Sequence, residues 1–118
     1  MTVEIEEYLD EDGRSPFGEW FDDLPAAAAA KVAVAIDRSG RGLLGDVKSV
    51  GSGVSERRID FGPGYRIYFA SIKEGRAVRV VILLGGGTKK GQKKDIEIAQ
   101  SRWKDCKARR RKGEDKWH

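Results

Sequence analysis

Hydrophobic and polar positions alternate at the start of the chain, before the pattern changes to a helical spacing. Val3 and Ile5 alternate with Glu4 and Glu6. This period of two is typical of a strand with one solvent-exposed face, so we expect a strand over residues 2–9. The acidic side chains would lie on the exposed face.

Two short helices are expected next. Ser15 can cap the first amides of a helix, and Pro16 suits its first turn. Apolar side chains then recur at i, i+3, i+4 and i+7, at Phe17, Trp20, Phe21 and Leu24. This stripe predicts a helix that ends near residue 24. The alanine-rich run after Pro25 predicts a second helix to about residue 39, which Gly40 ends.

Strand-like runs fill the middle of the chain, after a glycine-rich segment at 41–53 that we expect to be mostly loop. Turn sequences at 61–64 and 73–75 divide residues 54–84 into three runs, which predicts an antiparallel meander. In its last strand, the alternating apolar side chains expected to face the helices are Val78, Val80, Ile82 and Leu84. The three glycines at 85–87 should end this strand and let the backbone approach a ligand closely.

A final helix is predicted by Ile96, Ala99, Trp103 and Cys106, whose spacings place them on one face. The basic residues at 109–112 have no apolar partners in this pattern. We therefore expect one domain over residues 1–108, followed by a basic, frayed tail over 109–118.

The composition excludes several classes of protein. A length of 118 residues suits one domain, and 36% charged residues suit a strongly solvated surface. Cys106 and His118 are the only residues of their types, so we expect no disulfide, metal site or cofactor. The longest apolar run, at 80–84, is far shorter than the ~20 residues of a membrane span. The acidic start is unlike a secretory signal, and we expect a cytoplasmic protein.

Charge is distributed unevenly. Residues 1–30 carry a net charge of −8 and residues 31–118 carry +12. A basic surface of this kind attracts polyanions such as RNA or DNA, although solvated charge is the simpler alternative. The phosphate-loop motif is absent, because Gln92 stands where that motif needs lysine.

Two arginines are expected to meet on one face of the meander. Arg58 and Arg66 come close if their strands pair through the turn at 62–64, and Lys89 and Lys90 follow the next strand toward the same edge. We expect both arginines on an open face, outside the core. Like charges at this distance are unfavourable unless Glu56 and Asp60 offset them or an anion binds.

Several segments, in this order and spacing, resemble the RelE/ParE toxin superfamily, and more closely its HigB-like addiction module killer group. They are Pro16-Phe17 with Trp20, Gly45-Asp46 with Lys48-Ser49-Val50-Gly51, Gly53-Val54-Ser55-Glu56 with Arg58, 62–69 with its Gly-Tyr-Arg motif, and Leu83-Leu84 with Gly86-Gly87, Lys89, Gln92 and Asp95-Ile96. The resemblance spans about residues 2–104. It implies an α+β, RelE-like fold: two N-terminal helices packed on a twisted, mainly antiparallel four-stranded sheet, plus a C-terminal helix.

The resemblance also implies the function of a type II toxin. Such a toxin would be a ribosome-dependent mRNA endoribonuclease that inhibits translation, with the RNA 2′-hydroxyl attacking the adjacent phosphate. Carried over by position, the residues implied to stabilise phosphoryl transfer are Arg58, Arg66, Lys89 and Lys90. Those implied to bind RNA are Tyr68, Lys48, Gln92, Lys93 and Lys94, with Tyr68 as the ring available to stack on a base.

Two other functions remain open. ParE-like members share the fold but inhibit DNA gyrase, and a basic nucleic-acid-binding module would not catalyse any reaction. The resemblance further implies a helix-turn-helix, HigA-like antitoxin as partner, in a possible heterotetramer. We expect this partner on the basic surface that carries Arg58 and Arg66, with the acidic residues 1–30 as the alternative.

Overall fold

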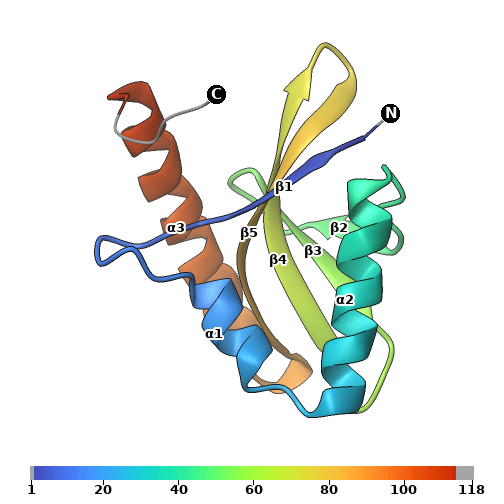
Figure 1. The fold of residues 1–118 in the computed structure, drawn as a ribbon. Helices are drawn as coiled ribbons and strands as arrows, with labels where there is room; N and C mark the ends of the chain where they lie inside the picture. Colours follow the sequence, from blue (N-terminus) through green and yellow to red (C-terminus); the bar gives the residue numbers. More distant parts are fainter. Residues whose placement is uncertain (1, 114–118) are drawn as a thin grey trace.

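A computed structural model describes residues 2–113 of the chain (Figure 1). Its elements are β1 (Glu4–Glu7), α1 (Pro16–Asp22), α2 (Ala26–Gly40), β2 (Val47–Ser49), β3 (Val54–Ile59), β4 (Tyr65–Glu74), β5 (Ala77–Thr88), the short 3₁₀ turn η1 (Lys89–Gly91) and α3 (Gln92–Arg111). The strands form one sheet in the order β1-β5-β4-β3-β2. β1 pairs with β5 in parallel and the other pairings are antiparallel, so the expected α+β architecture is confirmed.

The sheet has five strands, one more than expected. Residues 47–49, within the segment expected to be mostly loop, form β2 and pair with residues 55–57 of β3. This three-residue edge strand lacks a clear alternating pattern of its own, and its partner strand decides its conformation. The two N-terminal helices begin as expected. The Ser15 Oγ caps α1 by accepting a hydrogen bond of 2.9 Å from the amide of Gly18, and α2 begins directly after Pro25 without a side-chain cap.

Both faces of the sheet are covered, each by different helices. Val81 and Leu83 of β5 belong to a cluster with Phe17 and Val32, on the side of α1 and α2. The alternate residues of β5 belong to a second cluster with the apolar face of α3; they are Val80, Ile82 and Leu84. The expectation that these three side chains face the N-terminal helices is therefore wrong. Of the four residues expected to face those helices, only Val78 packs on that side, because the register shifts beside Ile72.

The three glycines at 85–87 lie inside β5 and do not end it. A Cβ atom at Gly86 would overlap the indole of Trp20, and one at Gly87 would overlap the carboxylate of Asp95. At Gly85 it would lie 2.6 Å from Nη1 of Arg102. The missing side chains therefore let α1 and α3 approach the two faces of β5, where we had expected close approach of a ligand.

α3 continues to Arg111, beyond the point where fraying was expected. Arg109 donates a 2.7 Å hydrogen bond to Asp105, and Nη2 of Arg110 lies 2.7 Å from Oε1 of Glu6 in β1. The first contact lies within α3, and the second ties the end of the helix to the acidic first strand. Residues 114–118, including His118, lie outside the described residues. Over the described range, none of the helices is both long and apolar enough for a membrane span.

Candidate active site

The pairing of β3 with β4 brings two arginines together. Arg58 stands directly opposite Arg66 in the register, as the sequence predicts. The turn between the strands includes Gly64, whose φ of 82° favours glycine. The carbonyl of Gly64 accepts a 3.1 Å hydrogen bond from the amide of Lys89, so the start of η1 is held beside the arginine pair.

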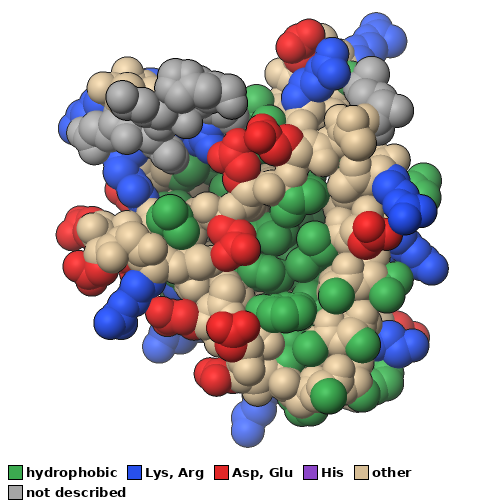
Figure 2. All heavy atoms as spheres, in the orientation of Figure 1, with side chains coloured by type: hydrophobic (Ala, Val, Ile, Leu, Met, Phe, Trp, Pro, Cys, Tyr) green, Lys and Arg blue, Asp and Glu red, His purple; other side chains and the backbone are tan. Residues whose placement is uncertain are grey.

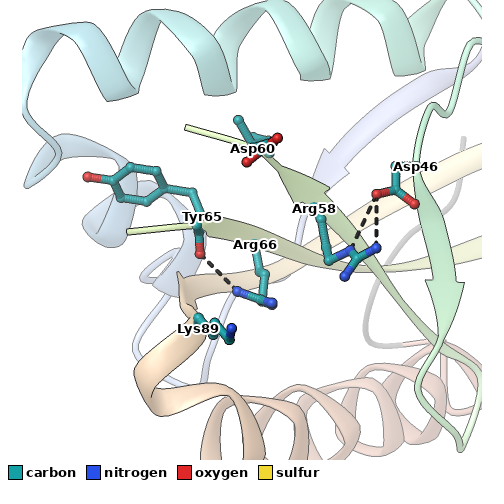
Figure 3. Close-up of a pocket in the computed structure, with 8 residues that line it drawn as sticks. Asp46, Arg58, Asp60, Tyr65, Arg66 and Lys89 are labelled. Atoms are coloured by element: carbon teal, nitrogen blue, oxygen red, sulfur yellow. Dashed lines mark hydrogen bonds and ion pairs between the residues drawn. The ribbon is translucent and has the colours of Figure 1, made fainter. Parts of the chain in front are cut away.

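Arg58, Arg66 and Lys89 line one pocket of about 350 Å³ (Figure 3). The other residues that line it are Asp46, Ile59, Asp60, Gly64 and Tyr65. Three basic side chains therefore face two carboxylates in a small open cavity. Lys90 is exposed in η1 next to Lys89, but it is not among the residues that line the pocket.

Arg66 is not on an open face, because its side chain is only 8% exposed. Its Nε lies 3.5 Å from Oε2 of Glu56, which is fully buried, and its Nη1 donates a 2.9 Å hydrogen bond to the carbonyl of Gly64. The same Glu56 oxygen accepts a 2.8 Å hydrogen bond from Nε2 of Gln92. Burial and these contacts hold the guanidinium at the pocket wall with little freedom to move.

Tyr68 lies opposite Glu56 in the register and is 1% exposed. Burial, followed by the nearby Glu56 charge, raises the pKa of the Tyr68 hydroxyl. Stacking on an RNA base needs an accessible ring, and this ring is enclosed within the cluster beneath α3. The amide of Gln92 is likewise engaged with Glu56. Tyr68 therefore belongs to the core, and Gln92 is bound to the carboxylate that pairs with Arg66.

Arg58 is far more accessible than Arg66. Its side chain is 53% exposed, and its Nε and Nη2 both lie 3.3 Å from Oδ2 of Asp46. Of the two carboxylates expected to offset the arginines, Glu56 pairs with Arg66, whereas Asp60 lines the pocket without forming an ion pair among the described residues. In this structure the charge of Arg58 is therefore offset by a carboxylate from the loop before β2.

Asp46 and the arginine that holds its loop were not among the site residues expected from the sequence. Arg57 is buried on the opposite face of β3, and its Nη1 donates hydrogen bonds to the carbonyls of Leu43 and Leu44. Burial lowers the pKa of the Arg57 guanidinium. A Cβ at Gly45 would lie 2.7 Å from this group, so the loop packs directly on it. The sequence does contain one indication of this contact: Arg57 is a charged residue at a position of β3 where the alternation predicts a buried side chain.

Three further lysines were expected to bind RNA: Lys48, Lys93 and Lys94. All are exposed, and none lines the pocket. Lys48 stands in β2 opposite Glu56, while the other two lie in the first turn of α3. Within the described range, no group of three or more His, Cys, Asp or Glu side chains is placed to hold a metal ion.

The fold and the pocket define a class of protein: a small α+β domain with fixed cations at one end of its sheet, suited to bind a phosphate or another anion. Residues 19–104 match the model of the family described as Phage derived protein Gp49-like (DUF891). The chain belongs to this family, which is a toxin-like family of the RelE/HigB type.

A protein of Haemophilus influenzae is 42% identical to the chain over 101 residues. The match covers 85% of this chain and 92% of that protein, which is described as uncharacterized. This similarity covers more of the chain than the family match does, and it assigns no activity.

Proposed function

We propose that the protein is the toxin of a type II toxin-antitoxin module and acts as an endoribonuclease on mRNA at the ribosome. The observation that supports this most directly is the convergence of Arg58, Arg66 and Lys89 in one pocket. Membership of a toxin-like family supports the same assignment.

The chemistry requires an RNA phosphate in this pocket. The 2′-hydroxyl loses its proton and attacks the adjacent phosphorus, and the bond to the 5′ oxygen breaks as that oxygen gains a proton. Negative charge grows on the phosphate oxygens during this step. Fixed cations stabilise that charge without reorganising, and in comparable oxyanion sites one donor is worth about 2.7–4 kcal/mol.

The proposed roles differ with the burial of each cation. Arg66 is held by Glu56 and Gly64 and would supply a preorganised charge. Arg58 is more exposed and would bind the incoming phosphate after leaving Asp46. Lys89 would contact the same phosphate from η1, while Lys90, Lys48, Lys93 and Lys94 would attract more distant parts of the RNA.

The test is to map mRNA 5′ ends after a brief induction of the protein in a bacterial host. New ends within translated codons are expected for the wild-type chain and should be lost in Arg58→Ala. Arg41→Ala is the matched control, because Arg41 is an exposed arginine in an ion pair with Asp37 and does not line the pocket. Intact messages with DNA damage would replace this proposal with gyrase inhibition. Salt-sensitive RNA binding without either effect would indicate a non-catalytic module.

A further inference from the structure

A second concave surface lies on the other side of the sheet from α3. It is a groove of about 630 Å³ between α1 and α2, over β1 and β5. Its apolar wall is formed by Ile5, Phe17, Phe21, Ala33, Ile36 and Leu83. Figure 2 shows these elements from the side on which apolar side chains gather in a hollow bordered by acidic ones. We call this surface the α1-α2 groove.

The border of the α1-α2 groove is acidic. Glu7, Asp22 and Asp37 line it, and all three are exposed. Asp37 forms an ion pair of 3.2 Å with Arg41, whereas Glu7 and Asp22 form no ion pair with any other described residue. Asp22 is also the last residue of α1, whose last turn contains no base. Two negative charges therefore stand uncompensated beside exposed apolar surface.

The apolar wall and the acidic border together indicate which kind of molecule the α1-α2 groove can bind. An RNA, a DNA or an anionic lipid surface would be repelled by the carboxylates, while a protein segment with both apolar and basic side chains would satisfy both features. We propose that the α1-α2 groove binds such a segment of the antitoxin: apolar side chains that fill the groove, flanked by lysine or arginine that pairs with Glu7 and Asp22. This inference rests on the proposed function, since it names the partner of the toxin.

The location differs from the basic surface around Arg58 and Arg66, where we expected the antitoxin because it would screen these cations. It includes part of the acidic residues 1–30, which were the alternative. The α1-α2 groove and the cationic pocket share no lining residue. An antitoxin bound in the groove would leave the arginines uncovered. It would then inhibit the toxin sterically, because the larger complex could not enter the site on the ribosome where the mRNA is cut.

The experiment measures binding of the full-length chain to the purified product of the gene adjacent to its own. Ala33→Arg fills the groove from an exposed position on α2, and Glu7→Lys with Asp22→Lys reverses its border. Each variant should weaken binding by about tenfold or more. The matched controls are Ala27→Arg and Glu19→Lys, which are exposed on the same helices and do not line the groove, and they should bind like the wild type.

Two readouts separate this inference from the proposed function. The groove variants should still cut mRNA, and co-expression of the adjacent gene should no longer rescue growth. Failure of the wild-type chain to cut mRNA would overturn the enzyme proposal and leave the binding result intact. The docking inference is overturned if the groove variants bind normally, if the adjacent gene product does not bind, or if reversing Lys93 and Lys94 weakens binding instead.

Discussion

Nε of Arg66 lies 3.5 Å from Oε2 of Glu56, and the two side chains are 8% and 0% exposed. One charge of the cationic pocket therefore belongs to a buried ion pair that also stabilises the sheet. Breaking such a pair leaves an unpaired charge in the interior, which is far more costly than losing an exposed pair. Arg58 lies directly opposite Arg66, but its ion pair with Asp46 is exposed to solvent.

Arg66→Ala should therefore destabilise the protein, contrary to the expectation that neither arginine is needed for the core. We expect the free energy of unfolding to fall by about 3–5 kcal/mol, because the buried Glu56 carboxylate keeps its hydrogen bond from Gln92 but loses its only cationic partner among the described residues. Urea denaturation of the purified variant measures this. The double variant Arg66→Met with Glu56→Gln should recover part of the loss. Wild-type stability of Arg66→Ala would show that Glu56 does not depend on Arg66.

Arg58→Ala should fold normally and lose activity. Its side chain is half exposed, so the free energy of unfolding should change by less than about 0.5 kcal/mol. Loss of one cation from the pocket should slow RNA cleavage about 100-fold. Cleavage rates on programmed ribosomes, with Arg41→Ala as control, provide the measurement. Equal rates in the two variants would remove Arg58 from the site.

Asp46→Asn should increase RNA affinity. The carboxylate of Asp46 competes with phosphate for Arg58, and exposed pairs of this kind are worth about 0.2–1 kcal/mol. Removing its charge should tighten RNA binding by up to about fivefold, measured by titration at low salt. Asp37→Asn is the control, since Asp37 pairs with an arginine outside the pocket. Weaker RNA binding in Asp46→Asn would show instead that Asp46 positions Arg58 productively.

Stability at alkaline pH should depend on Tyr8. Burial and the 2.6 Å hydrogen bond to Asp105 raise the pKa of the Tyr8 hydroxyl to about 12, above its ordinary value of 10.0. Between these two values the unfolded chain has lost this proton and the folded chain retains it, so folding becomes less favourable as pH rises. Tyr8→Phe should lose less stability between pH 10 and 12 than the wild type does, in chemical denaturation at several pH values. If the free energy of unfolding fell equally with pH in both proteins, the pKa of the Tyr8 hydroxyl would not be raised by folding.

Gly86→Ala should disturb the packing of α1 on the sheet. A Cβ atom there would overlap the indole of Trp20, and overpacking of this kind costs about 1–3 kcal/mol. Gly40→Ala is the control, because a Cβ at that position would lie 3.7 Å from the nearest side-chain atom, at ordinary contact distance. Thermal denaturation should show a lower midpoint for Gly86→Ala alone. Equal midpoints would show that Trp20 can move without cost.

Local patterns predicted the elements well. The start of α1 at Pro16 and the face of α3 marked by Trp103 and Cys106 depend on residues within a few positions of one another. Capping and helical spacing act over such short distances, so the sequence contains the necessary information. The facing of Arg58 and Arg66 was also predictable, because a short turn and strand alternation set that register.

Contacts between distant segments decided the rest. The sequence by itself determined the order of the elements, the α+β class and the approach of the two arginines. Only the tertiary structure decided that α3 covers Tyr68 and Glu56, that Asp46 pairs with Arg58, and that the three glycines of β5 accommodate helices. The physical reason is that burial and ion-pair partners depend on which element covers each face of the sheet. Which helix covers which face depends on packing across the whole chain, and it cannot be predicted from the periodicity of one segment.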